Sequence, residues 1–209
     1  MSIRLLLVRH GETADNASKV FQGRRGRGLN ERGVAQAARL AERLRGAKIA
    51  RVITSDLERA IETARHVATI AGREIELEPE LREVDVGAWT GLSYAEVEAR
   101  FPEEWAAWRD GVDLRRGGGE TYAELGARIA RAIDRIARTS ETSDVVVVSH
   151  GAALRTFVCR VLGISVSSRS LGAMTNTAVT TVEHDGTTAR LVSFNDASHL
   201  EPSLRCVSS

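Results

Sequence analysis

Two short apolar runs, each ending in a His-Gly pair, constrain the fold of this chain more than any other feature. Residues 5–8 are bulky aliphatic residues, followed at once by the Arg-His-Gly of residues 9–11. Residues 145–148 form a second aliphatic run, followed by the Ser-His-Gly of residues 149–151. Such runs are typical of strands buried on both faces of a parallel sheet, and ligands of open α/β sheets bind beyond the carboxyl ends of the strands. We therefore expect both histidines at one rim of a parallel sheet.

The paired histidines indicate a site for an oxyanion. A single histidine after a strand is more often a structural residue than a functional one, but two imidazoles at one rim reverse that expectation. His10 and His150 would lie there together with the guanidinium group of Arg9, which is suited to paired hydrogen bonds with anionic oxygens. Gly11 would let the backbone approach the ligand closely, because it has no Cβ.

Four short blocks in a fixed order carry a resemblance to a known family. They are Arg9-His10-Gly11-Glu12-Thr13 with Asn16, Ser55-Asp56-Leu57-Glu58-Arg59-Ala60 with Thr63-Ala64, Arg82-Glu83 with Gly87-Ala88-Trp89 and Gly91, and Ser149-His150-Gly151. These blocks resemble the signature of the histidine phosphatase superfamily, the phosphoglycerate mutase-like proteins. They cover most of the chain, so the resemblance implies the fold of that family as well as its chemistry.

The resemblance also implies roles for individual residues. On chemistry alone either histidine could attack phosphorus, and the match to the Arg-His-Gly block assigns the nucleophile to His10. Glu83 is implied to protonate the leaving oxygen and then to take a proton from the water that hydrolyses the phosphohistidine. Arg9, Arg59 and a protonated His150 are implied to bind the phosphoryl oxygens and cancel their charge. The further implied phosphate or substrate contacts are Gly11, Thr13, Asn16, Gln22, Gly23 and Gly151.

No metal or other cofactor is expected. The sequence has no cluster of residues with the spacing of a metal site, and transfer through a phosphohistidine requires none. A helix that starts after Gly151 would instead point its positive end toward the anion.

Three functions remain open at this point. Mutases of the family resemble one another in a long insertion between the glutamate block and the second histidine block. Here Glu83 and His150 are only 67 positions apart (150 minus 83), too few for that insertion. We therefore favour hydrolysis of a phosphomonoester on a small phosphorylated metabolite, such as a phosphorylated sugar or acid. A cofactor-dependent phosphoglycerate mutase and a non-catalytic phosphate-binding protein are the alternatives, although the complete set of catalytic residue types weighs against the second.

Two arginine-rich, glycine-rich loops could recognise the rest of the substrate. Their cations could bind a second acidic group, such as the carboxylate of a phosphorylated sugar acid. These cations are Arg24, Arg25, Arg27, Arg115 and Arg116.

Alternating strands and helices predict a single α/β domain over residues 1–209, a three-layer sandwich whose mainly parallel sheet has helices on both faces. A turn signal at residues 184–186 predicts a late hairpin and hence some antiparallel pairing. Helices are expected at 30–45, 56–72, 93–100, 102–110, 121–138 and after residue 151, and further strands at 52–54, 75–77, 177–183 and 189–194. Expected inward-facing residues are Val34, Ala37, Ala38, Ala41 and Leu44 in the first helix and Leu154, Phe157, Val158 and Leu162 in the last. Trp105 and Trp108 are expected to pack rather than bind ligand.

Composition limits the partners and the location. The net charge of +1 gives no reason to expect nucleic acid, and no apolar run approaches the length of a membrane span. The first strand begins within three residues of the N-terminus, so we expect no signal peptide and a cytoplasmic protein. Two cysteines, Cys159 and Cys206, do not make a disulfide framework. The expected partner is a small phosphoester substrate, and a homodimer is compatible with the sequence because dimers are common among similar proteins.

Overall fold

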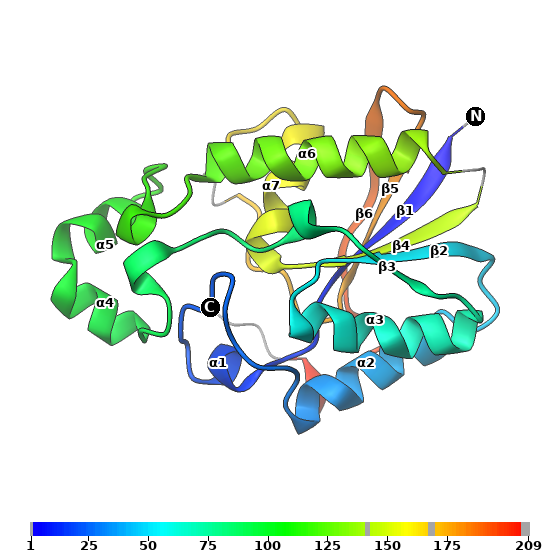
Figure 1. Ribbon diagram of the computed structural model, residues 1–209, viewed down its shortest axis with the longest axis horizontal. Coiled ribbons are helices and arrows are strands. Elements are labelled where there is room, and N and C mark those ends of the chain that lie inside the picture. The colour runs from blue at the N-terminus through cyan, green and yellow to red at the C-terminus, as the bar shows by residue number, and fades with distance from the viewer. Residues whose placement is uncertain (1, 141–142, 167–169, 206–209) are drawn as a thin grey trace.

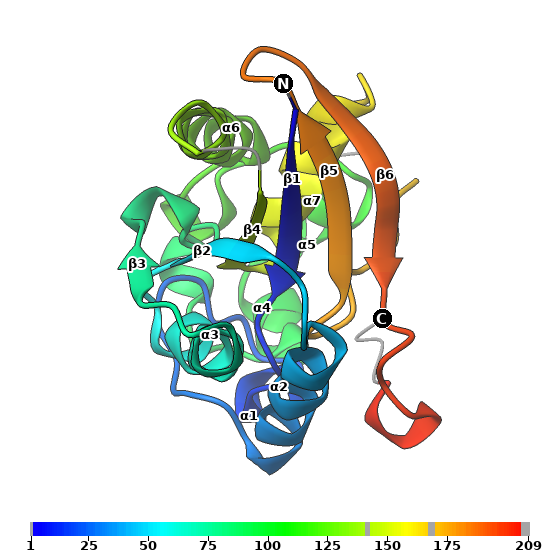
Figure 2. The same cartoon turned by 90° about the vertical axis from the view of Figure 1, so that its right-hand side faces the viewer.

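A computed structural model of the chain describes residues 2–140, 143–166 and 170–205. Within these ranges the chain forms a six-stranded sheet in the order β3-β2-β4-β1-β5-β6, with helices on both faces (Figures 1 and 2). The strands are β1 (Ile3–Arg9), β2 (Ile49–Thr54), β3 (Ile75–Leu77), β4 (Asp144–Ser149), β5 (Val179–His184) and β6 (Ala189–Asp196). The helices are α1 (Ala14–Ala17), α2 (Glu31–Arg43), α3 (Glu58–Ala71), α4 (Tyr94–Arg100), α5 (Pro102–Arg109), α6 (Tyr122–Arg138) and α7 (Gly151–Val161), with 3-10 turns at Pro79–Leu81, Gly87–Trp89, Arg116–Gly118 and Pro202–Leu204. The predicted α/β sandwich is confirmed.

Pairing in the sheet is mainly parallel. Strands β3, β2, β4 and β1 run parallel to one another, whereas β5 is antiparallel to both β1 and β6. The late hairpin is thus confirmed, and its strand β5 makes both antiparallel pairings of the sheet.

Each face of the sheet packs against its own pair of helices, because successive side chains of a strand point to opposite faces. Leu5 and Leu7 of β1 belong to a core with α6 and α7, and Leu6 and Val8 belong to a core with α2 and α3. The short helices α4 and α5 project beyond the carboxyl ends of the strands (Figure 1). They place aromatic residues over the rim where the two histidines were expected.

Local sequence signals explain where the helices begin and end. The Asn30 side chain caps α2 by accepting the N–H of Gly33 at 2.8 Å, and Thr121 begins α6 with a reciprocal capping box. Gly72 ends α3 in the left-handed region, with φ of 60°.

Two of the expected inward faces were wrong in part. Val34 is 45% exposed and Ala38 is also exposed, because α2 turns its Gly33 side toward the sheet. Leu162 is 44% exposed because α7 ends one residue earlier, at Val161. Cys159 is buried in the core as expected, and Cys206 lies outside the described residues.

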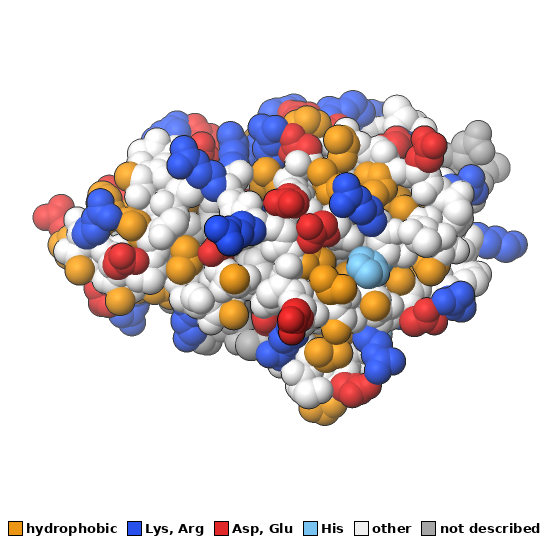
Figure 3. Space-filling view, turned by 60° about the horizontal axis from the view of Figure 1, so that its bottom comes forward, with side chains coloured by type: hydrophobic (Ala, Val, Ile, Leu, Met, Phe, Trp, Pro, Cys, Tyr) orange, Lys and Arg blue, Asp and Glu red, His pale blue; other side chains and the backbone are white. Residues whose placement is uncertain are grey.

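On the side seen in Figure 3, acidic and basic side chains are interspersed over the surface. In the part of the chain that the structure describes, every helix is too short or too polar to cross a membrane.

Candidate active site

The register of two neighbouring strands brings the predicted histidines together. Arg9 at the end of β1 lies opposite Ser149 at the end of β4, and the N–H of His10 donates to the Ser149 carbonyl oxygen at 2.9 Å. The centroids of the His10 and His150 rings are 5.2 Å apart. Residues separated by 140 positions therefore share one site at the rim of the sheet, as the two His-Gly pairs predicted.

The contacts of His10 define its protonation state. Its Nδ1 lies 2.7 Å from the carbonyl oxygen of Gly11, which can only accept, so Nδ1 carries the proton. Its Nε2 accepts a hydrogen bond from the Nε–H of Arg59 at 3.2 Å. His10 is therefore fixed as the tautomer whose Nε2 lone pair is free of a proton.

His150 is buried completely and caps the N-terminus of α7 with its backbone. Its Nε2 lies 2.9 Å from the hydroxyl oxygen of Ser55, and its Nδ1 has no hydrogen-bond partner among the described residues. An unsatisfied buried ring nitrogen is costly in a folded protein, so this atom is suited to contact a ligand.

Both imidazoles are held neutral by their surroundings. Burial lowers the pKa of His10 well below its usual value, and the positive charges of Arg59 and Arg9 lower it further. The pKa of His150 is lowered in the same direction, first by burial and then by Arg59. A neutral His10 is the form that can act as a nucleophile.

Two buried arginines lie beside the histidines. Arg59, in the first turn of α3, donates to the carbonyl oxygens of Arg25 at 2.7 Å and Gly23 at 2.8 Å. Burial lowers the pKa of Arg59 to about 10, which still leaves it charged at neutral pH. Arg9 donates to the Met174 carbonyl oxygen, while its Nε has no partner within the described ranges. Burial also lowers the pKa of Arg9.

The Glu83 side chain is bound at the N-terminus of α7, an interaction that the sequence did not predict. Its carboxylate accepts the N–H groups of Ala152 and Ala153, each at 3.2 Å, and that of Val84 at 2.8 Å. The helix does point its positive end at an anion, but that anion is a side chain of the protein. The main chain before Glu83 is held by Arg128, which donates to the Arg82 carbonyl oxygen at 3.0 Å.

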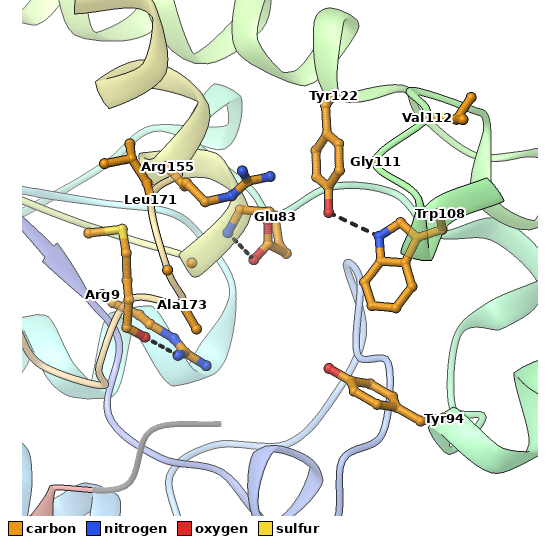
Figure 4. Close-up of a pocket in the computed structure, with 14 residues that line it drawn as sticks. Arg9, Glu83, Tyr94, Trp108, Gly111, Val112, Tyr122, Arg155, Leu171 and Ala173 are labelled. Carbon is orange, nitrogen blue, oxygen red and sulfur yellow. Dashed lines mark hydrogen bonds between the residues drawn. The ribbon is translucent and has the colours of Figure 1, made fainter. Parts of the chain in front are cut away.

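A cavity of about 410 Å³ opens directly beside this cluster (Figure 4). Arg9, Glu83 and Gly151 line its inner side. His10 is only 3% exposed and does not itself line the cavity, and a phosphate that reaches its Nε2 must displace Arg59 from that atom.

Aromatic side chains form the opposite wall of the cavity. Tyr94, Trp108 and Tyr122 face Glu83 and Arg155 across it, and the Nε1–H of Trp108 donates to the Tyr122 hydroxyl at 3.3 Å (Figure 4). Trp105 and Trp108 both pack against other aromatic rings, as expected. Trp108 packs on Phe21 and also lines the cavity.

The remaining predicted phosphate contacts do not share this cavity. Thr13 and Gln22 line a separate hollow of about 290 Å³, and Gln22 is buried there with an unpartnered side-chain oxygen among the described residues. The Asn16 side-chain oxygen accepts the N–H of Thr13 at 3.2 Å and the amide of Asn176 at 3.4 Å. Gly11 packs against the backbone of α2 at Gly33.

None of the five arginines proposed to bind a second acidic group lines this cavity, and two of them, Arg25 and Arg27, line the separate hollow beside Gln22. Arg115 pairs with Glu124, and Arg24 donates to Glu120 at 3.2 Å. Arg116 is buried with its guanidinium 3.8 Å from the centre of the Tyr122 ring, behind the aromatic wall. Arg155, by contrast, lines the cavity together with Arg9.

Sequence reasoning missed several residues of the site, among them Arg155 and Asn176. Arg155 lies one helical turn after Gly151, so the helical period alone could have placed it on the same side of α7. Asn176 donates to the His10 carbonyl oxygen at 2.8 Å, and it comes from a loop before β5 that carries no motif. In the ranges described, no group of three or more His, Cys, Asp and Glu side chains could hold a metal ion.

Comparison with known proteins agrees with this geometry. Residues 5–197 match the family described as histidine phosphatase superfamily (branch 1). The chain is 37% identical over 203 residues to phosphoglycerate mutase-like protein 4 of Arabidopsis thaliana, covering 94% of this chain and 86% of that protein. It is 36% identical over 200 residues to the metal-independent phosphoserine phosphatase of the same plant, covering 94% and 82%.

Solved structures give the same result. Mycobacterial glucosyl-3-phosphoglycerate phosphatase in complex with VO3 superposes with a TM-score of 0.84 at 30% identity, covering 93% of this chain and 99% of that one. Bacillus stearothermophilus YhfR superposes with a TM-score of 0.87 at 30% identity, covering 95% and 100%. The resemblance seen in the four sequence blocks is thus confirmed over nearly the whole chain.

Proposed function

Since this chain belongs to the histidine phosphatase superfamily, we propose that it hydrolyses the phosphomonoester of a small metabolite through a phosphohistidine on His10. The observation that carries the proposal is the tautomer of His10, which leaves Nε2 unprotonated beside two buried arginines. Phosphatases among its relatives and structural neighbours support hydrolysis as the reaction.

Binding of the phosphate begins the mechanism. The dianion accepts hydrogen bonds from the guanidinium groups of Arg59 and Arg9. Arg59 then no longer donates to His10 Nε2, so the lone pair of that nitrogen is free to attack. The approaching negative charge also raises the pKa of His150, which takes up a proton and donates its own hydrogen bond. Three cationic groups then cancel the charge on the phosphoryl oxygens, which is the main requirement of this transfer.

Glu83 acts first as the general acid and then as the general base. As the bond from His10 Nε2 to phosphorus forms, the bond from phosphorus to the leaving oxygen breaks, and the Glu83 carboxyl protonates that oxygen. The carboxylate then takes a proton from water, the oxygen of which attacks phosphorus and releases His10. The backbone donors on the carboxylate keep it aimed into the cavity throughout.

A phosphoglycerate mutase is the second candidate, because the relatives include phosphoglycerate mutase-like protein 4. The short segment between Glu83 and His150 favours the hydrolase, since the cavity beside the phosphate site is open to water. A non-catalytic phosphate-binding role is disfavoured by the position of Glu83, because binding a dianion does not call for a carboxylate.

Phosphate release and phosphoryl transfer can be measured on one substrate. With 3-phosphoglycerate we expect inorganic phosphate to accumulate and little 2-phosphoglycerate, and His10→Ala should abolish both products. Isomerisation without release would favour the mutase. Phosphate binding with no turnover over a panel of phosphomonoesters would favour the binding protein.

The proposal includes a metal-independent enzyme in the cytoplasm that acts on small molecules and not on nucleic acid. A homodimer remains compatible with it, and sedimentation analysis of the purified protein would decide this.

A further inference from the structure

The cavity holds one cation more than the phosphate chemistry uses. Its charged lining residues, within the described ranges, are Arg9, Glu83 and Arg155. The mechanism above assigns Arg9 to the phosphate and Glu83 to the leaving oxygen. Arg155 thus has no part in the phosphoryl transfer, although it lines the space that the rest of the substrate must occupy.

The position of Arg155 is fixed by its neighbours. Its guanidinium lies 5.0 Å from the centre of the Tyr122 ring, within the range of a cation–π contact. That ring is itself fixed by the Trp108 hydrogen bond to its hydroxyl and by the buried guanidinium of Arg116, 3.8 Å from its centre. Figure 4 shows Arg155 reaching into the cavity toward Tyr122, from the same side as Glu83. The cation is thus held in place before any ligand binds.

The shape of the cavity suits a leaving group larger than a methyl or ethyl group. Its volume of about 410 Å³ lies within the range of small-molecule sites. The rings of Tyr94, Trp108 and Tyr122 offer flat apolar surface for a carbon skeleton, while a planar guanidinium at the edge matches a planar carboxylate.

On the basis of the proposed function, we propose that Arg155 is a specificity-determining residue that binds a carboxylate on the leaving group. The second acidic group that the sequence suggested would thus be bound by α7, not by the loop that carries Arg115 and Arg116. Arg115 pairs with Glu124 outside the cavity, and Arg116 lies behind the aromatic wall.

Two substrates that differ only in a carboxylate test this directly. We would measure kcat and KM for O-phosphoserine and O-phosphoethanolamine with wild type, Arg155→Gln, Arg155→Lys and the control Arg160→Gln. Arg160 is on the same helix, but it pairs with Asp134 outside the cavity. Wild type should prefer O-phosphoserine, and Arg155→Gln should lower its kcat/KM by about 10- to 100-fold, mainly through KM, because a charge-assisted hydrogen bond is lost. O-phosphoethanolamine should change less than about threefold, Arg155→Lys should recover part of the loss, and Arg160→Gln should resemble wild type.

A binding measurement separates this inference from the proposed function. By calorimetry, 3-phosphonopropionate should bind wild type more tightly than propylphosphonate, and Arg155→Gln should remove the difference whether or not the protein turns over substrate. Equal losses on both phosphoesters, or a preference for the carboxylate that survives in Arg155→Gln, would overturn the role of Arg155 and leave the phosphatase intact. Hydrolysis that persists in His10→Ala would instead overturn the proposed mechanism.

Discussion

Replacing Gly33 by alanine should damage the active site, because this glycine lies where α2 touches the loop after β1. A Cβ at Gly33 would lie 2.1 Å from the Glu12 carbonyl oxygen, and real Cβ contacts are essentially never closer than 3.0 Å. The helix and the loop after β1 must therefore separate by at least 0.9 Å (3.0 minus 2.1). That loop carries His10, two residues before Glu12, so the displacement reaches the proposed nucleophile.

Two opposing free energies set the size of the effect on stability. Alanine is favoured over glycine inside a helix by about 1 kcal/mol. Forcing extra volume into a packed contact costs about 1–3 kcal/mol, and sometimes more. The displaced Glu12 carbonyl also accepts the N–H of Asn30 at 3.0 Å, and weakening that bond adds to the cost. We expect Gly33→Ala to be destabilised by about 1–2 kcal/mol net and to lose about 100-fold in kcat, the order of loss for a displacement of about 1 Å.

Gly126 in α6 provides the matched control. A Cβ there would meet its nearest neighbour, Val166 Cγ1, at an ordinary 3.4 Å. Gly126→Ala should therefore gain up to about 1 kcal/mol from helix propensity and keep full activity. Urea unfolding and steady-state kinetics would be compared for both variants. If Gly33→Ala gained stability as Gly126→Ala does and kept its activity, the close approach of α2 to the catalytic loop would be refuted.

Three further predictions concern charge. The folded pKa values of His10 and His150 lie below the unfolded value, so below about pH 6.5 the unfolded chain binds protons that the folded chain does not. As the pH is lowered in this range, the free energy of unfolding should decrease by about 1.4 kcal/mol per pH unit for each histidine. His150→Gln should therefore make the free energy of unfolding, measured by urea unfolding from pH 7 to pH 5, depend less on pH; an unchanged pH dependence would contradict the lowered pKa of His150. Glu83→Gln should lower kcat/KM, which reports the steps up to phosphorylation of His10, by about 10²- to 10⁴-fold for alkyl phosphates but much less for 4-nitrophenyl phosphate, the leaving group of which needs no proton; equal losses in kcat/KM would rule out proton donation to the leaving group. Arg128→Met removes the 2.8 Å ion pair with Glu120 and the hydrogen bond to the Arg82 carbonyl oxygen, while Glu120 keeps its contact with Arg24, so we expect a loss of about 1–3 kcal/mol; a loss below about 0.5 kcal/mol would show that these contacts do not stabilise the Glu83 segment.

The part of the site that was predictable from sequence is the part that follows from strand order. Residues 5–8 and 145–148 are aliphatic runs that no solvated strand would carry, so burial and parallel pairing could be inferred from them. Once β1 and β4 are neighbours in register, the residues just after them must be adjacent, and His10 and His150 are. The late hairpin was equally predictable, because its turn residues lie between two β-rich segments.

What could not be predicted depends on how distant elements approach one another. The buried side of α2 is determined by the contact of Gly33 with the loop after β1. Side-chain hydropathy alone predicted that Val34 faces inward, but Val34 is exposed. The N-terminus of α7 binds Glu83 because a segment about 70 residues earlier crosses it (153 minus 83). Arg155 was overlooked because its guanidinium is positioned by Tyr122, which is distant in the sequence and lies beside it only in the folded chain.

Trapping the phosphorylated protein tests the central claim most directly. The wild type, His10→Ala and His150→Ala would be mixed with a ³²P-labelled phosphomonoester, quenched in alkali, which preserves phosphohistidine, and mapped by peptide mass spectrometry. We predict label on His10 in the wild type, reduced label at the same residue in His150→Ala, and none in His10→Ala. Label on His150, or equal labelling of His10→Ala and wild type, would contradict the account.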